Sequence, residues 1–233
     1  MNELLSELDS VFKSPTIKPT FQYVHIVLSL ILFGENAEGI GRYRLQKELE
    51  IGAGTVKSLF NKLKEVTKFI IVPSEGKLNA DKLQRRGHVL TQKGFEFLAK
   101  IKRKIPLLKK ADLEYLKDIV IKQEEVNSYF CLVKKVSTKL SYGVEQRDAA
   151  IKVSGSGATC LVYDGINLFF PTKTAFKDDK DNTKINPKTL NYFKSEIEDA
   201  KVKMEKNDVI IIGSGDNYQK ARLATLNAAL TLF

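Results

Sequence analysis

Two short amphipathic segments separated by a glycine-containing break lie between Arg42 and Lys64. In the first, Leu45 and Leu49 stand four residues apart, which places both on one face of a helix. In the second, apolar residues recur at the i, i+3, i+4, i+7 spacing of a core-facing stripe, at Val56, Leu59, Phe60 and Leu63. Two such helices joined by a tight turn predict a helix-turn-helix.

The segments on either side extend this pattern. An almost continuously apolar run over residues 23–31, ending at Gly34, predicts a buried first helix. His25 lies inside that run, and we expect it to be a packed core residue rather than a metal ligand, because the other histidine, His88, is distant in sequence.

A β-hairpin is expected after the second amphipathic segment. Residues 69–72 are rich in β-branched side chains, residues 73–77 have the composition of a turn, and the basic stretch 82–90 returns as a second strand. Thr91 is then predicted to cap a helix that buries Phe95, Leu98, Ile101 and Ile105.

The junction between hairpin and helix resembles a known signature. Leu90-Thr91-Gln92-Lys93-Gly94 is similar to the Leu-Thr-x-Lys-Gly sequence that opens the helix after the wing in MarR-like, PadR-like and related prokaryotic regulators. Residues 20–106 therefore resemble a winged helix-turn-helix domain, preceded by an N-terminal extension over residues 1–19. The resemblance implies binding of duplex DNA, with winged helices that bind proteins or RNA as alternatives.

Positive charge is concentrated in this part of the chain. Residues 1–110 hold 20 Lys and Arg against 11 Asp and Glu, whereas residues 111–233 hold 18 against 17. Such asymmetry indicates a polyanionic partner for the first part, either nucleic acid or an anionic membrane surface.

A DNA complex would divide the polar residues of this domain between two roles. Short side chains on the second helix are candidates for reading base edges, namely Thr55, Ser58 and Asn61. Cations are candidates for phosphate contacts, namely Arg42, Arg44, Lys57, Lys62, Lys64, Lys77, Lys82, Arg85 and Arg86. A solvated lysine-rich helix face is the alternative interpretation. Because such domains usually read DNA as dimers, we expect a homodimer through residues 1–12 or 95–105.

The remaining residues, 107–233, predict a small α/β domain, so the fold class is α+β with two domains. Strands are expected at residues 129–133, 158–163, 167–170 and 209–212. Helices are expected at residues 144–151, from Asn186 and Pro187 to Met204, and at the C-terminus to Leu230. Residues 107–111 are predicted to be a short connection.

Two segments of this domain are candidates for binding a small ligand. Gly213-Ser214-Gly215, predicted as a turn between strand and helix, would present backbone amides to an anion. The alternative is a tight turn followed by a capping box of Asp216 and Gln219. The polar residues Glu145, Arg147 and Asp148 would line a pocket or an interface, or would form ion pairs on a helix surface.

Several function classes lack sequence support. No Ser-His-Asp, Cys-His or metal-ligand set is apparent, so we expect no catalytic site, no metal and no cofactor. Cys131 and Cys160 are expected to be buried free thiols. The longest apolar stretch is too short to span a bilayer, and the acidic start of the chain does not have the basic start of a secretory signal, which indicates a cytoplasmic protein.

The whole chain resembles archaeal proteins that couple a winged helix to a C-terminal α/β domain of unknown function. Residues 145–148, 157–159 and 209–216 carry this resemblance. It implies a transcriptional regulator whose second domain senses a metabolite or mediates dimerisation. The alternative is a small-molecule enzyme fused to a regulatory winged helix, as in archaeal nucleotide-dependent riboflavin kinases.

Overall fold

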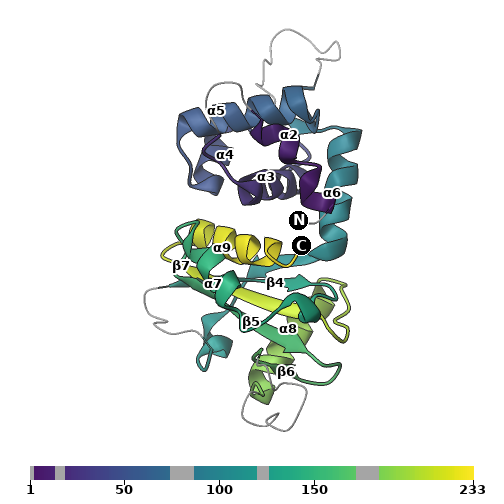
Figure 1. Cartoon of the computed structure of the whole chain (residues 1–233), viewed down its shortest axis with the longest axis vertical. Helices are drawn as coiled ribbons and strands as arrows, with labels where there is room; N and C mark the ends of the chain where they lie inside the picture. The colour runs from purple at the N-terminus through teal and green to yellow at the C-terminus, as the bar shows by residue number, and fades with distance from the viewer. Residues whose placement is uncertain (1–2, 14–18, 74–86, 120–125, 172–183) are drawn as a thin grey trace. The chain divides into compact units, whose positions relative to one another are not determined.

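The computed structural model describes residues 3–13, 19–73, 87–119, 126–171 and 184–233 (Figure 1). The chain forms two compact units, unit 1 (Met1–Ile101) and unit 2 (Lys102–Phe233). The boundary between them lies inside a helix rather than at the predicted position after Pro106.

Unit 1 is mainly helical. Its elements are α1 (Glu3–Ser6), α2 (Asp9–Phe12), α3 (Tyr23–Glu35), α4 (Arg42–Leu49), α5 (Ala53–Asn61), the π-helical turn η1 (Lys62–Val66), β1 (Ile70–Ile71), β2 (Val89–Leu90) and α6 (Gln92–Lys104). As the spacing predicts, Leu45 and Leu49 of α4 are buried, and so is the apolar stripe Val56, Leu59, Phe60 and Leu63. The first helix continues past Gly34 to Glu35.

The first residues of the chain are part of this core rather than an extension of it. Leu8 and Val11 are fully buried. The Tyr23 hydroxyl donates a hydrogen bond to the Asp9 carboxylate at 2.6 Å, and the Phe12 ring lies 4.6 Å from the Tyr23 ring. Apolar side chains at helical spacing in residues 4–11 therefore fold back onto α3.

His25 is a core residue, as predicted. Its ring is buried, and Nδ1 accepts a hydrogen bond from the Gln22 amide at 2.9 Å. Burial lowers the pKa of His25 to about 4, which keeps the ring neutral at physiological pH.

A small antiparallel sheet closes unit 1. Ile70 pairs with Leu90, and an isolated bridge joins Ile40 to His88. Thr91 caps α6 as predicted, because its hydroxyl accepts a hydrogen bond from the Gly94 amide at 3.1 Å. A Cβ atom on Gly94 would lie 2.3 Å from the Phe69 carbonyl oxygen, so a glycine lets α6 pack directly on the backbone just before β1.

The prediction that Phe95 is buried is wrong. Its side chain is 52% exposed, whereas Phe97 is 2% exposed and stacks on Phe69 with ring centroids 5.0 Å apart. Leu98, Ile101 and Ile105 are buried as predicted. With α6 beginning at Gln92, the core-facing positions include Gly94, and Phe95 is rotated out of that stripe.

Unit 2 is a mixed α/β structure. Its elements are β3 (Leu107–Lys110), η2 (Leu113–Leu116), β4 (Asn127–Val133), η4 (Ser137–Lys139), α7 (Val144–Ile151), β5 (Gly157–Tyr163), β6 (Leu168–Phe169), α8 (Pro187–Asp199), β7 (Val209–Gly215) and α9 (Tyr218–Leu230). The described strands form one antiparallel sheet in the order β3-β4-β7-β5-β6. Phe193 and Ile197 of α8 pack with Phe130 and Ile210 in a core on one face of the sheet. Helices α7 and α9 pack against each other and against the sheet (Figure 1).

Several predicted elements of unit 2 are confirmed. Helix α7 covers residues 144–151, and Asn186 caps α8 by accepting a hydrogen bond from the Thr189 amide at 2.9 Å. Two boundaries are corrected. Helix α8 ends at Asp199, so Met204 lies in the segment after it, and residues 107–110 form an edge strand instead of a connection.

Strand β7 is longer than predicted and includes the residues that were expected to form a glycine turn. Gly213, Ser214 and Gly215 pair with β4 as part of the strand. A Cβ atom on Gly213 would lie 2.4 Å from the Thr225 amide nitrogen, so this glycine allows α9 to approach the sheet. The cap of α9 is Asn217, which accepts a hydrogen bond from the Lys220 amide at 2.8 Å, rather than Asp216.

This close approach predicts the effect of a single methyl group. Gly213→Ala should destabilise unit 2 by about 1–3 kcal/mol, because the backbone of α9 must move to admit the Cβ atom. Gly54→Ala is the matched control, since a Cβ there meets nothing within 4 Å and should stabilise α5 by up to about 1 kcal/mol. Urea unfolding of the full chain measures both variants. Equal stabilities for the two would contradict the packing described here.

Candidate nucleic-acid interface

Helix α5 has a buried inner face and an exposed polar outer face. Val56 and Leu59 are buried in the core of unit 1, whereas Lys57 and Asn61 are exposed one turn apart on the other side. Lys64 continues this line into η1 and is also exposed. We call Lys57, Asn61 and Lys64 the outer stripe.

Lys64 already has a carboxylate neighbour. Its ammonium lies 3.3 Å from the Glu65 carboxylate, and Lys68 lies 3.6 Å from the same side chain. All three groups are well exposed to solvent. Exposed pairs of this kind contribute about 0–1 kcal/mol, so a phosphate can displace Glu65 from Lys64 at small cost.

Arg42, Lys64 and His88 come together from three elements. Arg42 is exposed at the start of α4, and the His88 ring packs edge-on against Phe60 with centroids 4.7 Å apart. Partial burial lowers the pKa of His88, and the charges of Lys64 and Arg42 lower it further. The base of the hairpin therefore lies in a positive electrostatic field that a phosphate would relieve.

Two of the other residues that were predicted to contact DNA form hydrogen bonds within unit 1. The Thr55 hydroxyl is 2.8 Å from the Thr20 hydroxyl, and the Lys62 ammonium donates a hydrogen bond to the Lys13 carbonyl at 2.7 Å. Ser58, between them on the helix, is half-buried. One flank of α5 is thus occupied by residues that precede α3.

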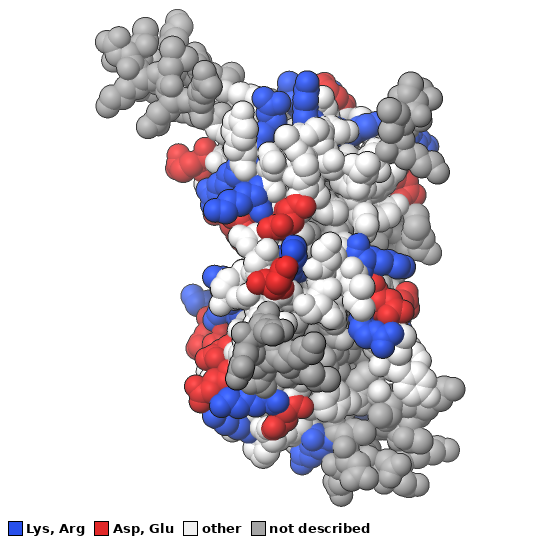
Figure 2. All heavy atoms as spheres, turned by 90° about the vertical axis from the view of Figure 1, so that its left-hand side faces the viewer, with Lys and Arg blue, Asp and Glu red and all other residues white. Residues whose placement is uncertain are grey.

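The remaining predicted cations divide into two groups. Arg44 is exposed on α4, next to Tyr43, which is 89% exposed. The other four, Lys77, Lys82, Arg85 and Arg86, were predicted on the hairpin and lie outside the described residues. Figure 2 shows that Lys and Arg gather in separate groups on one face of the molecule, with Asp and Glu beside several of them. The outer stripe is therefore distinguished by its place on α5 rather than by charge alone.

In unit 2, the predicted polar cluster lies on the surface of α7. Glu145, Arg147 and Asp148 are exposed, and Arg147 forms an ion pair with Asp148 at 2.9 Å, which agrees with the helix-surface alternative. Arg147 also borders a hollow of about 220 Å³ with Tyr142 and Pro171.

The second predicted ligand segment does not offer free amides at a helix N-terminus. The Gly213 amide donates to the Thr225 hydroxyl, and the Ser214 hydroxyl lies 2.9 Å from that of Ser128. Gly215 pairs with β4, and Asp216 forms an ion pair with Lys220 at 2.7 Å. The premise of an anion-binding glycine turn is therefore wrong.

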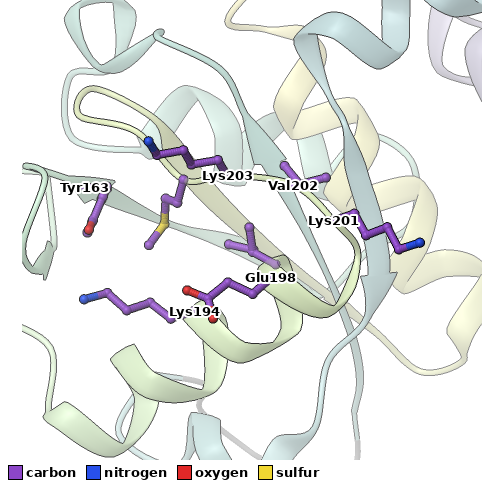
Figure 3. A pocket seen from close by; sticks show the side chains of 8 residues that line it. Tyr163, Lys194, Glu198, Lys201, Val202 and Lys203 are labelled. Atoms are coloured by element: carbon purple, nitrogen blue, oxygen red, sulfur yellow. The ribbon is translucent and has the colours of Figure 1, made fainter.

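A different hollow in unit 2 was not predicted. It has a volume of about 460 Å³ and lies beside the end of α8 (Figure 3). Its lining residues are Tyr163, Lys194, Ile197, Glu198, Lys201, Val202, Lys203 and Met204. Cationic and apolar residues alternate at 201–204, but this pattern is also typical of a strand at the protein surface, so it does not identify a hollow.

The acidic, histidine and cysteine side chains and the helices of the described residues bear on metal binding, thiol chemistry and membrane insertion. None of them form a group of three or more His, Cys, Asp or Glu side chains placed to hold a metal ion. Cys131 and Cys160 are buried free thiols, as predicted, and burial raises the pKa of Cys160 to about 12. In the described part of the chain, every helix is too short or too polar to cross a bilayer.

Comparisons with known proteins place the second unit in context. A family of domains of unknown function, DUF4443, matches residues 125–232, and no curated protein matches the chain. Among solved structures, the hypothetical protein PH0730 from Pyrococcus horikoshii OT3 is similar, with a TM-score of 0.59 and 23% sequence identity. The match covers 90% of this chain and 91% of that one. This chain therefore shares its fold with a protein from an archaeon over nearly its whole length.

Proposed function

We propose that unit 1 is a winged helix-turn-helix domain that binds duplex DNA through the outer face of α5, as part of a cytoplasmic transcriptional regulator. The observation that carries this proposal is the exposure of Lys57 and Asn61 on the side of α5 opposite its buried stripe. A helix held in this way can enter a major groove without losing its core contacts.

The elements around α5 support the winged-helix interpretation. Helices α4 and α5 are followed by the antiparallel pair β1 and β2 and then by α6, which is the expected order. The Leu-Thr-x-Lys-Gly pattern also has a physical explanation here. Thr91 caps α6 and donates a hydrogen bond to the Lys68 carbonyl at 2.6 Å, and Gly94 lets the helix pack on the backbone just before β1.

In this proposal, the outer stripe and Arg42 have two kinds of contact with DNA. Lys57, Lys64 and Arg42 contact phosphates, which fixes the position of α5 on the duplex. Asn61 reads a base edge, since its amide pairs with the N6 and N7 atoms of adenine. Thr55 and Lys62, which were predicted to contact DNA, also have a structural role. Their hydrogen bonds to Thr20 and Lys13 hold the segment before α3 beside α5 and η1.

Measuring duplex binding at several salt concentrations tests the proposal. Fluorescence anisotropy of the full chain with a mixed-sequence duplex should give a log–log salt slope of about −3 or steeper, if three phosphates meet Arg42, Lys57 and Lys64. Selection from a random duplex pool should then enrich one sequence. Absence of binding at about 50 mM salt would contradict the proposal.

The position of His88 predicts a pH dependence. Because its pKa is lowered in the free protein, His88 is neutral at pH 7, and a nearby phosphate would raise that pKa. Duplex binding should therefore take up a proton and tighten, by up to about tenfold, as pH falls below the pKa that His88 has in the complex. In His88→Gln the added tightening should disappear. An unchanged pH profile in this variant would show that His88 does not face the DNA.

A homodimer through α6 fits the exposed surface of unit 1. The apolar side chains of α1 and α2 are used in the core of the same chain, whereas Phe95 on α6 remains 52% exposed. Aromatic side chains are enriched at protein–protein interfaces, so we place the dimer contact at Phe95. For unit 2 we propose a sensory role, supported by the hollow beside α8.

A further inference from the structure

The hollow beside α8 is built from a rigid helix end. Two residues after the last residue of α8, Asp199, Lys201 adopts a left-handed conformation with φ of 57°. The Lys201 amide donates to the Glu198 carbonyl at 2.8 Å, and the Val202 amide donates to the Ile197 carbonyl at 3.1 Å. This paired arrangement is a Schellman motif, in which Val202 packs near Ile197. The wall of the hollow is therefore preformed.

The inner surface of the hollow is apolar. Ile197 is 1% exposed, and Val202 and Met204 are half-buried against the same core. The ring of Tyr163 completes this floor. A volume of about 460 Å³ lies within the range of about 300–1,000 Å³ that small-molecule sites occupy.

Three lysines and one acidic residue, Glu198, line the rim of the hollow, so its charge is mainly positive. Figure 3 shows the ammonium groups of Lys194 and Lys203 on the same side as the Tyr163 hydroxyl, while Lys201 points away. Lys194 donates a hydrogen bond to the Ile166 carbonyl at 3.2 Å, which holds its ammonium near the opening. Within the described ranges, no carboxylate lies within 4.0 Å of either ammonium.

Lysines near the end of a helix often stabilise its terminal carbonyls. Here the Ile197 and Glu198 carbonyls are already bonded to backbone amides. The ammonium groups of Lys194 and Lys203 are therefore not used at these carbonyls, and that of Lys194 lies 5.8 Å from the centre of the Tyr163 ring, beside the apolar floor.

We propose that this hollow binds an amphipathic organic anion, with its acidic group between Lys194 and Lys203 and its apolar body against Ile197, Val202 and Met204. This rests on the proposed sensory role of unit 2 and is independent of DNA binding. A neutral molecule of the same shape lacks the two charge-assisted contacts and binds more weakly.

Fluorescence of the amphipathic aromatic sulfonate 1-anilinonaphthalene-8-sulfonate with the full chain, in the absence of DNA, tests the proposal. The probe should bind and be displaced by octanoate, but at least about tenfold less effectively by the neutral octanol. The variant Lys194→Met/Lys203→Met should bind the probe at least about tenfold more weakly. Lys139→Met, an exposed lysine elsewhere on unit 2, is the control and should bind it normally.

Three results would overturn the proposal: no saturable binding of the probe, equal competition by octanoate and octanol, or normal binding by the double variant. Unfolding curves establish that each variant is folded. Because the assay contains no DNA, failure here leaves duplex binding by unit 1 intact. Conversely, the variant Lys57→Glu/Lys64→Glu should bind the probe normally even if it fails to bind DNA.

Discussion

Replacing Lys57 and Lys64 together by Glu should weaken duplex binding of the full chain by at least about 100-fold at low salt. Each change removes a phosphate contact and adds a repulsive charge in its place, on α5 for Lys57 and on η1 for Lys64. The salt slope should become shallower by about 2, and the loss should be similar for all sequences. Anisotropy titrations at several salt concentrations measure both quantities.

The control for this experiment is an equal change in net charge on the other unit. Lys139→Glu/Lys152→Glu alters two exposed lysines of unit 2 and should change the affinity by less than about threefold. Similar losses in both double variants would mean that binding follows overall charge, and the docking of α5 would be wrong.

Truncating Phe97 should destabilise unit 1 by about 3–5 kcal/mol, whereas truncating Phe95 should cost less than about 0.5 kcal/mol. Phe97 is 2% exposed and stacks on Phe69, so Phe97→Ala leaves a cavity where α6 meets β1. Phe95→Ala removes a side chain that is 52% exposed. The two changes have the same chemistry and lie two residues apart on one helix.

Urea unfolding followed by circular dichroism measures this pair. A larger loss for Phe95→Ala would mean that α6 is rotated from the orientation described here. Phe95→Ala also bears on assembly, because it should weaken a homodimer formed through α6, as sedimentation would show.

Elements defined by local chemistry were predictable from the sequence. The i, i+3, i+4, i+7 spacing located the buried stripe of α5, and Thr91 and Asn186 were identified as helix caps. Each of these features depends on residues within about two turns of one another, so a single sequence contains the necessary information.

Features that depend on distant partners were not predictable. Gly213 was interpreted as a turn residue, but it lies in β7 because it pairs with Tyr129 of β4 and Ala158 of β5. The strand at residues 107–110 is two leucines followed by two lysines, which is too short to show a period, and it is defined by its pairing with β4.

The candidate interface shows the same division. The exposure of Lys57 and Asn61 follows from the period of α5, whereas the partners of Thr55 and Lys62 lie 35 and 49 residues away in the sequence. The hollow in unit 2 depends on Tyr163 of β5 meeting residues 194–204, which local sequence cannot reveal.

Site-directed cross-linking tests most directly whether the outer face of α5 contacts DNA. Cys131 and Cys160 are buried with raised thiol pKa values, so a cysteine introduced at Asn61 can be labelled selectively with a photoreactive group. A label at Asn61→Cys should cross-link to bound duplex DNA, whereas a label at Ile151→Cys, exposed on α7, should not. If the labelled variants bind DNA, but the cross-link forms from residue 151 and not from residue 61, then α5 does not contact DNA in the way proposed.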